Sequence, residues 1–597
     1  METIHLEKIE HGSFVTDEGT IFTVWAPHAK AVHVFGSFND WNEDSHPLEA
    51  VENGCWSAFI PEAKIGDEYK YCITTADDQK LHKNDPYARI LTNSSGNSII
   101  YKDLFDWQGV EFKMPPMNQL KIYEMHIGTY HRTDENGPGT FASAIEKLDH
   151  LKNMGINCVE IMPVNEFAGD WSWGYNPAFP YAIESAYGGP DGFKNFVKAC
   201  HERGIGVILD VVYNHFGPSD LDLWQFDGWS ENGKGGIYFY NDWKSTTPWG
   251  DTRPDYGRNE VRQYIHDNAM MWLDEYRCDG LRMDMVPYIR NVYGDESEGN
   301  NIEEGFSLLR WINDEIHERW PEKITIAEDL HGNNFITDGT DVGGCAFSAQ
   351  WDADFVHPVR AILTNGRDED IDMQAVVDSL SKVYSNDAFR RVIYTESHDE
   401  VANGQARITT EVDDQNPHSY YAVRKSVLGM VLTLTAAGMP MLFQGQEMLE
   451  DQWFDDQDPL DWELAEKNSG IIQMVSDLCH LRESEKYPGL FGAHTKFILV
   501  DQEKKILGIQ RSHLEDLSEG VMIFYNFSSG TYENYSIFPD TPLVAECIFN
   551  SSQEAYHAEL TPQLDGFYFE QQEDNGSYSI TTHFNPLSAK LFSYKHN

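Results

Sequence analysis

Basic residues are scarce in this chain of 597 residues. The 44 Lys and Arg stand against 97 Asp and Glu, which gives a net charge of −53 at pH 7. A surface of that sign repels the phosphates of nucleic acids and of anionic lipids. The acidic residues are scattered along the chain, so we interpret the charge as a means of solubility. The composition therefore excludes nucleic-acid and membrane-surface partners and favours a neutral or cationic one.

Long apolar runs and paired cysteines are also missing. The opening METIHLEKIEHG has neither the basic start nor the apolar core of a secretory signal. The longest apolar stretch, residues 426–443, is interrupted by Gly-Met-Pro and predicts a helix, a turn and a strand instead of a membrane span. The eight cysteines show no C-x-x-C or zinc-like spacing and predict buried free thiols. These absences favour a cytoplasmic protein.

The chain is too long for one hydrophobic core, and its residue pattern changes twice. Residues 1–108 and residues 489–597 alternate apolar and polar positions, which predicts a β-sandwich at each end. Between them, over 119–488, strand-like runs alternate with amphipathic stretches, as in a parallel α/β fold. We therefore predict an α/β protein in which a (β/α)8 TIM barrel is flanked by two β-sandwich domains.

Eight strand-like runs in the central region support the barrel. They cover residues 121–127, 156–164, 206–212, 278–284, 324–329, 344–351, 391–397 and 439–445. The competing fold is a doubly wound nucleotide-binding sheet. It is disfavoured because no G-x-G-x-x-G or Walker loop follows any of the eight runs.

Four of these runs lead into an acidic residue. Asp210, Asp284 and Glu328 close the runs GVILD, DGLRMD and ITIAE, and Asp399 follows RVIYTESH. A carboxylate at the tip of a buried strand is costly unless it has a partner or a task. Because the C-terminal ends of barrel strands meet at one face, we expect these acids to converge on one sugar-sized site. Paired carboxylates in such a site suit glycoside chemistry.

Two of the acids have sequence neighbours that predict different roles. Arg282 lies two residues before Asp284, hence on the same face of the strand, and is expected to lower the pKa of Asp284 and keep it ionised as a nucleophile. Glu328 follows a continuous apolar run, so desolvation is expected to raise its pKa, as a general acid requires. With the two carboxylates about 5 Å apart, the reaction would retain anomeric configuration through a covalent glycosyl-enzyme. The structural alternatives are a plain salt bridge for Arg282 and a helix-capping turn for S-H-D-E.

Four short segments, DVVYNH, GLRMD, IAED and SHDE, resemble in order and spacing the conserved regions of glycoside hydrolase family 13, the α-amylase superfamily. The resemblance implies a nucleophile at Asp284, an acid/base at Glu328 and a transition-state stabiliser at Asp399. It also implies a set of residues around the sugar at the cleavage point: Tyr175, Asp210, His215, Arg282 and His398. Asn214 matches a position that binds calcium in many amylases. Other members lack the metal, so no cofactor is expected apart from a candidate calcium ion.

The motifs outside these four regions resemble more than one subgroup. VWAP, VFGSFNDW and NDPYAR resemble a family 48 carbohydrate-binding module. SHDEVANG, FQGQE and DPLDW resemble 1,4-α-glucan branching enzymes, which cleave α-1,4 links and transfer the chain to form α-1,6 links. AYGGPDGF, VVYNHFGP and AQWDADF resemble maltooligosyltrehalose trehalohydrolases.

The resemblance implies an α-1,4-glucan partner such as amylose, glycogen or maltooligosaccharide. Branching is the main expectation, and a hydrolase of the trehalohydrolase or α-amylase type is the alternative. A catalytically dead glucan-binding or scaffold protein is disfavoured because Asp284, Glu328 and Asp399 are all present. The sequence leaves the oligomeric state open.

Overall fold

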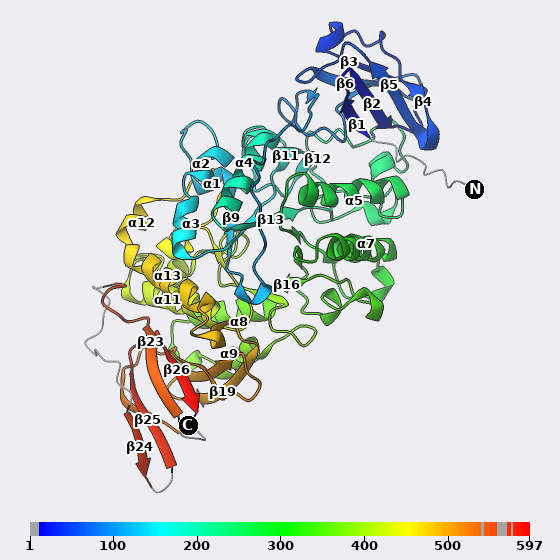
Figure 1. The fold of residues 1–597 in the computed structure, drawn as a ribbon. Helices are drawn as coiled ribbons and strands as arrows, with labels where there is room; N and C mark the ends of the chain where they lie inside the picture. The colour runs from blue at the N-terminus through cyan, green and yellow to red at the C-terminus, as the bar shows by residue number, and fades with distance from the viewer. Residues whose placement is uncertain (1–10, 539–542, 558–569, 575–576, 597) are drawn as a thin grey trace.

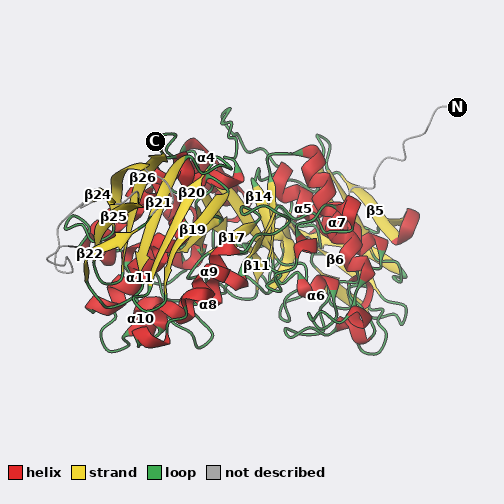
Figure 2. Ribbon diagram, turned by 90° about the horizontal axis from the view of Figure 1, so that it is seen from below, coloured by secondary structure: helices red, strands yellow, loops and turns green. Residues whose placement is uncertain are grey.

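The computed structural model describes residues 11–538, 543–557, 570–574 and 577–596. Its three parts follow one another along the chain, with the N-terminal sheets at one end, the barrel in the middle and the C-terminal sheets at the other end (Figure 1). Figure 2 shows the same arrangement from below, with β5 and β6 far from the strands of the C-terminal part.

The N-terminal part consists of two antiparallel sheets. One has the order β1-β2-β5-β4, and in the other β6 pairs with β3, β7 and β8. The strands are β1 (Gly12–Val15), β2 (Thr20–Trp25), β3 (Ala31–Gly36), β4 (Glu49–Ala50), β5 (Cys55–Ile60), β6 (Glu68–Thr74), β7 (Lys80–Lys83) and β8 (Ser98–Ile99). Alternating residues such as Val32, Val34, Tyr69 and Tyr71 are buried, as the sequence pattern predicts for a sheet with one face on a core.

The central part is a closed barrel of eight parallel strands, so the predicted TIM barrel is confirmed and a doubly wound sheet is excluded. All eight predicted runs contain a barrel strand. The strands are β9 (Ile122–Met125), β10 (Cys158–Ile161), β13 (Gly206–Val211), β14 (Gly280–Met283), β15 (Ile324–Ala327), β16 (Ala349–Trp351), β17 (Arg391–Ile393) and β18 (Met439–Phe443). Their inward-facing apolar residues form a buried cluster of their own, which includes Ile122, Ile208, Ile326, Val392 and Met441.

Amphipathic helices surround the barrel. In α4 (Gly189–Glu202) the buried Phe193, Phe196, Val197 and Cys200 recur at the spacing of one helix face. The other longer helices are α3 (Leu148–Met154), α5 (Asn259–Asp274), α7 (Glu303–Arg319), α8 (Ala353–Thr364), α9 (Met373–Ser381), α11 (Tyr420–Thr435) and α13 (Ser469–Glu483). Short helices are α1 (Ile127–Tyr130), α2 (Phe141–Ile145), α6 (Pro287–Arg290), α10 (Ile408–Val412) and α12 (Glu463–Lys467), and a hairpin of β11 (Asn165–Phe167) and β12 (Pro177–Ile183) follows β10.

The C-terminal part has two sheets, as predicted. A five-stranded sheet has the order β19-β20-β21-β26-β23, and a three-stranded sheet has the order β22-β25-β24. The strands are β19 (His494–Asp501), β20 (Ile506–Ser512), β21 (Glu519–Asn526), β22 (Tyr532–Ile537), β23 (Leu543–Asn550), β24 (Glu570–Asp574), β25 (Ser577–Phe584) and β26 (Ser588–His596).

Polar contacts fasten both end parts to the barrel. The hydroxyl of Tyr264 on α5 donates to the carbonyl of Pro86 (2.9 Å), which follows β7. At the other end, Nη1 of the buried Arg511 on β20 donates to the carbonyl of Thr435 at the end of α11 (2.7 Å). Because these groups are buried, each contact satisfies a backbone carbonyl that water does not reach.

Two predictions about composition can be compared with the structure. All eight cysteines are free thiols; seven are buried and Cys547 is partly exposed. Within the described ranges, none of the helices has the length and the apolar character needed to cross a bilayer.

Candidate active site

A single buried arginine gathers three of the predicted acids. Nη1 of Arg282 on β14 donates to both oxygens of Asp210 (2.8 and 2.7 Å) and to Oδ1 of Asp284 (3.1 Å). Its Nη2 lies 2.8 Å from Oε2 of Glu328. The guanidinium is fully buried, so these charge-assisted contacts operate in a low dielectric. The structure therefore brings together acids that come from three adjacent barrel strands.

Strand register explains why these residues meet. Asp210 on β13 pairs in register with Arg282, and Arg282 pairs with Ile326 on β15, so their side chains share one face. Asp284 and Glu328 follow the ends of β14 and β15, and their amides donate to the carbonyls of Val211 (3.0 Å) and Met283 (3.0 Å). These hydrogen bonds extend the barrel ladders past the strand ends and hold both acids at the C-terminal face of the barrel.

Burial raises the pKa of both Asp284 and Glu328. For Glu328 burial outweighs the opposing charge of Arg282 and raises the pKa to about 7, and Asp284 adds to the rise. This agrees with the expectation for a general acid. For Asp284 the expectation was wrong in sign. Burial raises its pKa too, although Arg282 and a hydrogen bond from Asn214 oppose the rise. The carboxylate loses more stabilisation when the closed barrel excludes water than it gains from the arginine that it shares with other acids.

Asn214 lies against Asp284. Its Nδ2 donates to Oδ2 (2.6 Å) and to the backbone carbonyl (2.8 Å) of Asp284, and its Oδ1 faces Nδ1 of His215. Calcium takes six to eight oxygen ligands, and here the only side-chain oxygen of Asn214 is engaged by an imidazole. The contacts of Asn214 thus fit orientation of Asp284 and do not fit calcium ligation.

His215 forms the wall of the site beside Asn214. Its ring stacks on Trp249 with centroids 4.7 Å apart. Burial lowers the pKa of His215 to about 3, against a hydrogen bond to the backbone of Tyr175. The imidazole is therefore neutral at pH 7.

The predicted His398 and Tyr175 form a second wall of the site, next to His215. Their rings stack 4.9 Å apart, and the Tyr175 hydroxyl donates to Oδ2 of Asp210 (2.6 Å). Nδ1 of His398 lies 2.5 Å from Oε1 of Glu124, and its backbone amide donates to Oε2 of the same carboxylate (3.0 Å). Burial alone lowers the pKa of His398, but the Glu124 carboxylate outweighs it and raises that pKa above its usual value. Tyr175 and His398 are therefore held by carboxylates of two barrel strands, Asp210 on β13 and Glu124 on β9.

Asp399 differs from the other predicted acids because it is exposed. Its Oδ1 accepts a hydrogen bond from Nδ2 of Asn403 (2.8 Å), and Arg282 does not hold it. Its charge still reaches the site, since it helps to raise the pKa of Glu328 and of His398. Asp399 thus lies at the solvent rim, beside Glu328.

Sequence reasoning missed three residues of the site. Glu124 on β9 anchors His398, and the Trp351 ring lies 4.4 Å from the guanidinium carbon of Arg282. Glu160 on β10 pairs in register with Glu124, and neither of its carboxylate oxygens has a hydrogen-bond partner within the described residues. Burial raises the pKa of Glu160 well above its usual value. The available signal was a lone glutamate inside each apolar run, KIYEMHI and INCVEI.

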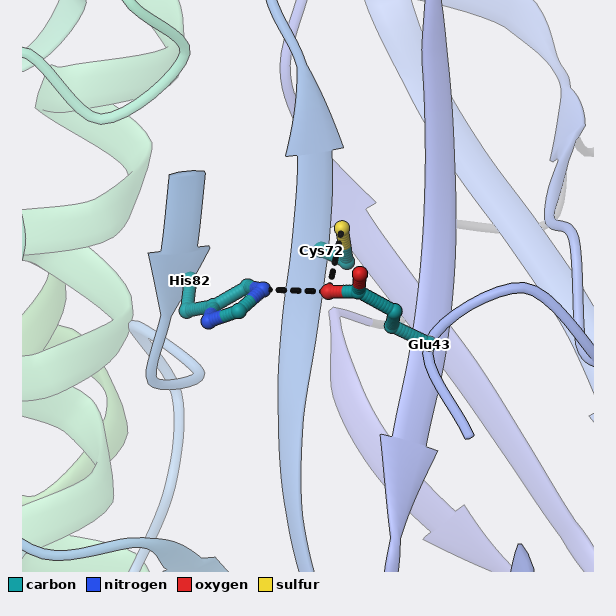
Figure 3. Close-up of side chains that lie close together, drawn as sticks. All are labelled: Glu43, Cys72 and His82. Atoms are coloured by element: carbon teal, nitrogen blue, oxygen red, sulfur yellow. Dashed lines mark hydrogen bonds and ion pairs between the residues drawn. The ribbon is translucent and has the colours of Figure 1, made fainter. Parts of the chain in front are cut away.

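Two further groups of metal-type ligands lie outside this site in the described part of the chain. Figure 3 shows Glu43, Cys72 and His82 of the N-terminal part, where Nε2 of His82 and Sγ of Cys72 lie 2.6 and 3.7 Å from Oε2 of Glu43. Nζ of Lys80 lies 3.1 Å from Oε1 of Glu43, so the ammonium group of Lys80 forms an ion pair with this carboxylate.

The second group is Glu296, Asp329 and His331. The guanidinium of Arg290 forms ion pairs with its two carboxylates, at 2.5 Å from Glu296 and 2.8 Å from Asp329. Both groups are explained as ion pairs.

Comparisons with known proteins agree with this geometry. Residues 10–88 match carbohydrate-binding module 48 (isoamylase N-terminal domain), and residues 125–225 and 221–484 match the α-amylase catalytic domain. A 1,4-alpha-glucan branching enzyme GlgB of Methylococcus capsulatus is 31% identical over 571 residues, which cover 90% of this chain and 75% of the relative. The enzyme of the same name from Picrophilus torridus is 30% identical over 607 residues, covering 98% and 81%.

Among solved structures, a putative α-amylase from Salmonella typhimurium matches with a TM-score of 0.71 at 22% identity, over 98% of this chain and 99% of that one. That likeness supports the fold. The family matches cover residues 10–88 and 125–484, and the two branching-enzyme relatives cover 90% and 98% of the chain. The protein therefore belongs to the α-amylase family of glycoside hydrolases, with an N-terminal family 48 module, in the group whose curated members are named 1,4-alpha-glucan branching enzymes.

Proposed function

We propose that this protein cleaves α-1,4 links of a glucan such as amylose or glycogen and transfers the released chain to a 6-hydroxyl, which forms an α-1,6 branch. The observation that carries the chemistry is the shared guanidinium of Arg282, which contacts Asp284 at 3.1 Å and Glu328 at 2.8 Å. Two carboxylates on one guanidinium can adopt the separation of roughly 5 Å that retaining glycosidases use.

The first half of the reaction breaks the glycosidic bond. Asp284 attacks the anomeric carbon and forms a covalent ester, while Glu328 gives its proton to the departing glycosidic oxygen. A pKa of about 7 leaves a large share of Glu328 protonated near neutral pH, as this step needs. Hydrogen bonds from Arg282 and Asn214 orient Asp284 and favour its charged form.

The second half transfers the chain. The acceptor 6-hydroxyl attacks the anomeric carbon, its proton passes to Glu328, and the ester bond to Asp284 breaks. Tyr175, stacked on His398, offers a ring face and a fixed hydroxyl beside the sugar. The exposed Asp399 is free to accept hydrogen bonds from sugar hydroxyls at the rim. If water replaces the acceptor, the same intermediate gives hydrolysis.

One incubation with amylose tests the proposal. Iodine colour, reducing ends and the proton NMR signal of α-1,6 links are followed together, with Asp284→Asn as the inactive control. Loss of colour with new α-1,6 signal and few new reducing ends is expected. Rising reducing ends without α-1,6 signal would make the protein a hydrolase. With no change on amylose, release of trehalose from maltooligosyltrehalose would assign the trehalohydrolase alternative.

A further inference from the structure

We propose that Trp243 and Tyr293 form a second glucan-binding site on the rim of the barrel's C-terminal face, on the loops that also carry the aromatic residues beside the active site. This inference rests on the proposed α-glucan function. It adds the place where a distant segment of the donor glucan, or of the acceptor glucan, is held during transfer.

The two side chains are exposed and lie next to each other. Trp243 is 55% exposed and Tyr293 is 60% exposed, and their ring centroids are 6.4 Å apart with an angle of 40° between the planes. A single exposed apolar side chain needs no explanation, but neighbouring exposed aromatic rings are typical of a binding surface. The open angle between the rings suits a chain that curves, as an α-1,4-glucan does.

A buried arginine holds both rings in place from behind. Nη1 and Nη2 of the fully buried Arg253 donate to the carbonyl of Lys244 (2.5 Å) and to the carbonyl of Val292 (2.6 Å). Lys244 follows Trp243 and Val292 precedes Tyr293, so one guanidinium fixes the backbone beside each ring. Such preorganisation lowers the entropy cost of binding.

The loops that carry the rings belong to the catalytic face. Trp243 begins a single 3-10 turn (Trp243–Ser245) between β13 and α5, and Tyr293 lies between α6 and α7, downstream of β14. β13 and β14 are neighbours in the barrel and carry Asp210 and Arg282. Loops that follow the C-terminal ends of adjacent strands lie on the same side as the active site.

Aromatic contacts connect the rim to the catalytic acids. Trp249 stacks on His215 and meets the ring of Tyr288 edge-on, with centroids 5.2 Å apart. The Tyr288 ring in turn lies against Gly294, where an added Cβ would come within 2.7 Å of it. Gly294 adjoins Tyr293, so the Tyr288 ring packs against the backbone next to Tyr293, whose own ring lies beside Trp243.

The ligand that fits the exposed rings of Trp243 and Tyr293 is a neutral sugar polymer. Ring faces stack on the apolar faces of sugars, and the net charge of −53 does not repel an uncharged chain as it would an anionic one. A bound segment here would lie away from the cleavage point, so long glucans would gain affinity and short ones would not.

Calorimetric titration of Asp284→Asn protein with maltotriose and with a long maltooligosaccharide tests the site, because that variant binds without turnover. Adding Trp243→Ala or Tyr293→Ala is expected to weaken binding of the long chain by about tenfold and to leave maltotriose unchanged. Tyr293→Phe keeps the ring and should bind like its parent. Phe538→Ala, which removes a 69% exposed aromatic of the C-terminal part, is the matched control and should not alter the ratio.

Equal long-chain affinity with and without the two rings, in variants whose unfolding temperatures are unchanged, would overturn the inference while the proposed function stands. An equal loss for maltotriose would also overturn it, because the rings would then belong to the cleavage site. If the Asp284→Asn parent binds neither sugar and the unmodified protein leaves amylose unchanged, both the proposed function and this inference fail.

Discussion

Two histidine–glutamate pairs in this molecule have nearly the same geometry and opposite surroundings. In the barrel, Nδ1 of His398 lies 2.5 Å from Glu124, and both side chains are buried. In the N-terminal part, Nε2 of His82 lies 2.6 Å from Glu43, and half of the His82 side chain is exposed (Figure 3). Distance alone therefore does not distinguish a pair at the surface from a pair buried beside the candidate active site.

The pKa values of the acids in the two regions shift in opposite directions, although a neighbouring cation lowers the pKa in both. Hydrogen bonds from His82 and then Lys80 lower the pKa of the partly exposed Glu43. Burial raises the pKa of Glu328 to about 7, although Arg282 lies 2.8 Å away. A neighbouring cation determines the direction of the pKa shift where water solvates the carboxylate. Desolvation determines it where the barrel excludes water.

The largest expected effect separates the two regions by activity. Asp284→Asn should lower the branching rate by about 10⁴-fold or more, because no ester to the sugar can form. Affinity for glucan should remain. His82→Gln should leave the rate within the error of the assay. Rates with amylose and Kd values for a maltooligosaccharide check both, and a substantial rate in Asp284→Asn would refute its role as nucleophile.

The next comparison breaks each histidine–glutamate pair. Glu124→Gln should lower the free energy of unfolding by about 3 kcal/mol, because it leaves His398 buried without its carboxylate. Glu124 raises the pKa of His398 above its ordinary 6.5, so this loss should be full below pH 6.5 and should shrink as pH rises through the raised value. Denaturant unfolding at several pH values measures it. Glu43→Gln is the matched surface control and should show no measurable change; equal losses in both variants would contradict the role of burial.

A smaller effect follows from the raised pKa of Glu328. Its folded-state pKa of about 7 lies above the ordinary 4.5, so ionisation of this buried carboxyl lowers the free energy of unfolding as pH rises from 4.5 to 7. The full loss is present above pH 7. Glu328→Gln removes that cost and should stabilise the protein by up to ~3 kcal/mol at pH 8 and by nothing at pH 4.5. Thermal unfolding across this pH range tests the sign. A stabilisation that does not depend on pH would show that burial of the charge is not the cause.

The smallest expected effect concerns the surface as a whole. A chain of net charge −53 repels itself, and salt screens exposed charges over about 10 Å at 0.1 M ionic strength. Sodium chloride should therefore raise the unfolding temperature by a few degrees without changing the stability difference between the unmodified protein and Glu124→Gln. A fall in unfolding temperature with salt would mean that surface ion pairs such as that of Glu43 with Lys80 outweigh the repulsion.

Most of the barrel and the acids Asp210, Asp284 and Glu328 could be predicted because their signals are local. A short apolar run that alternates with amphipathic stretches predicts a parallel strand, and the acid that follows it must lie at the strand's end. The two-residue spacing of Arg282 and Asp284 likewise determines that they share a face.

Contacts between distant parts of the chain decided the rest. Glu124 anchors His398 across 274 positions of sequence, and Trp351 covers Arg282 from another strand, so neither role is visible locally. The pKa of Asp284 depends on how much water the closed barrel excludes, and that sum over eight strands reversed the sign expected from Arg282 alone. The sequence by itself determined that Asp210, Asp284 and Glu328 reach the site. Only the tertiary structure decided which distant residues join them and what their electrostatics are, because desolvation depends on everything that surrounds a group.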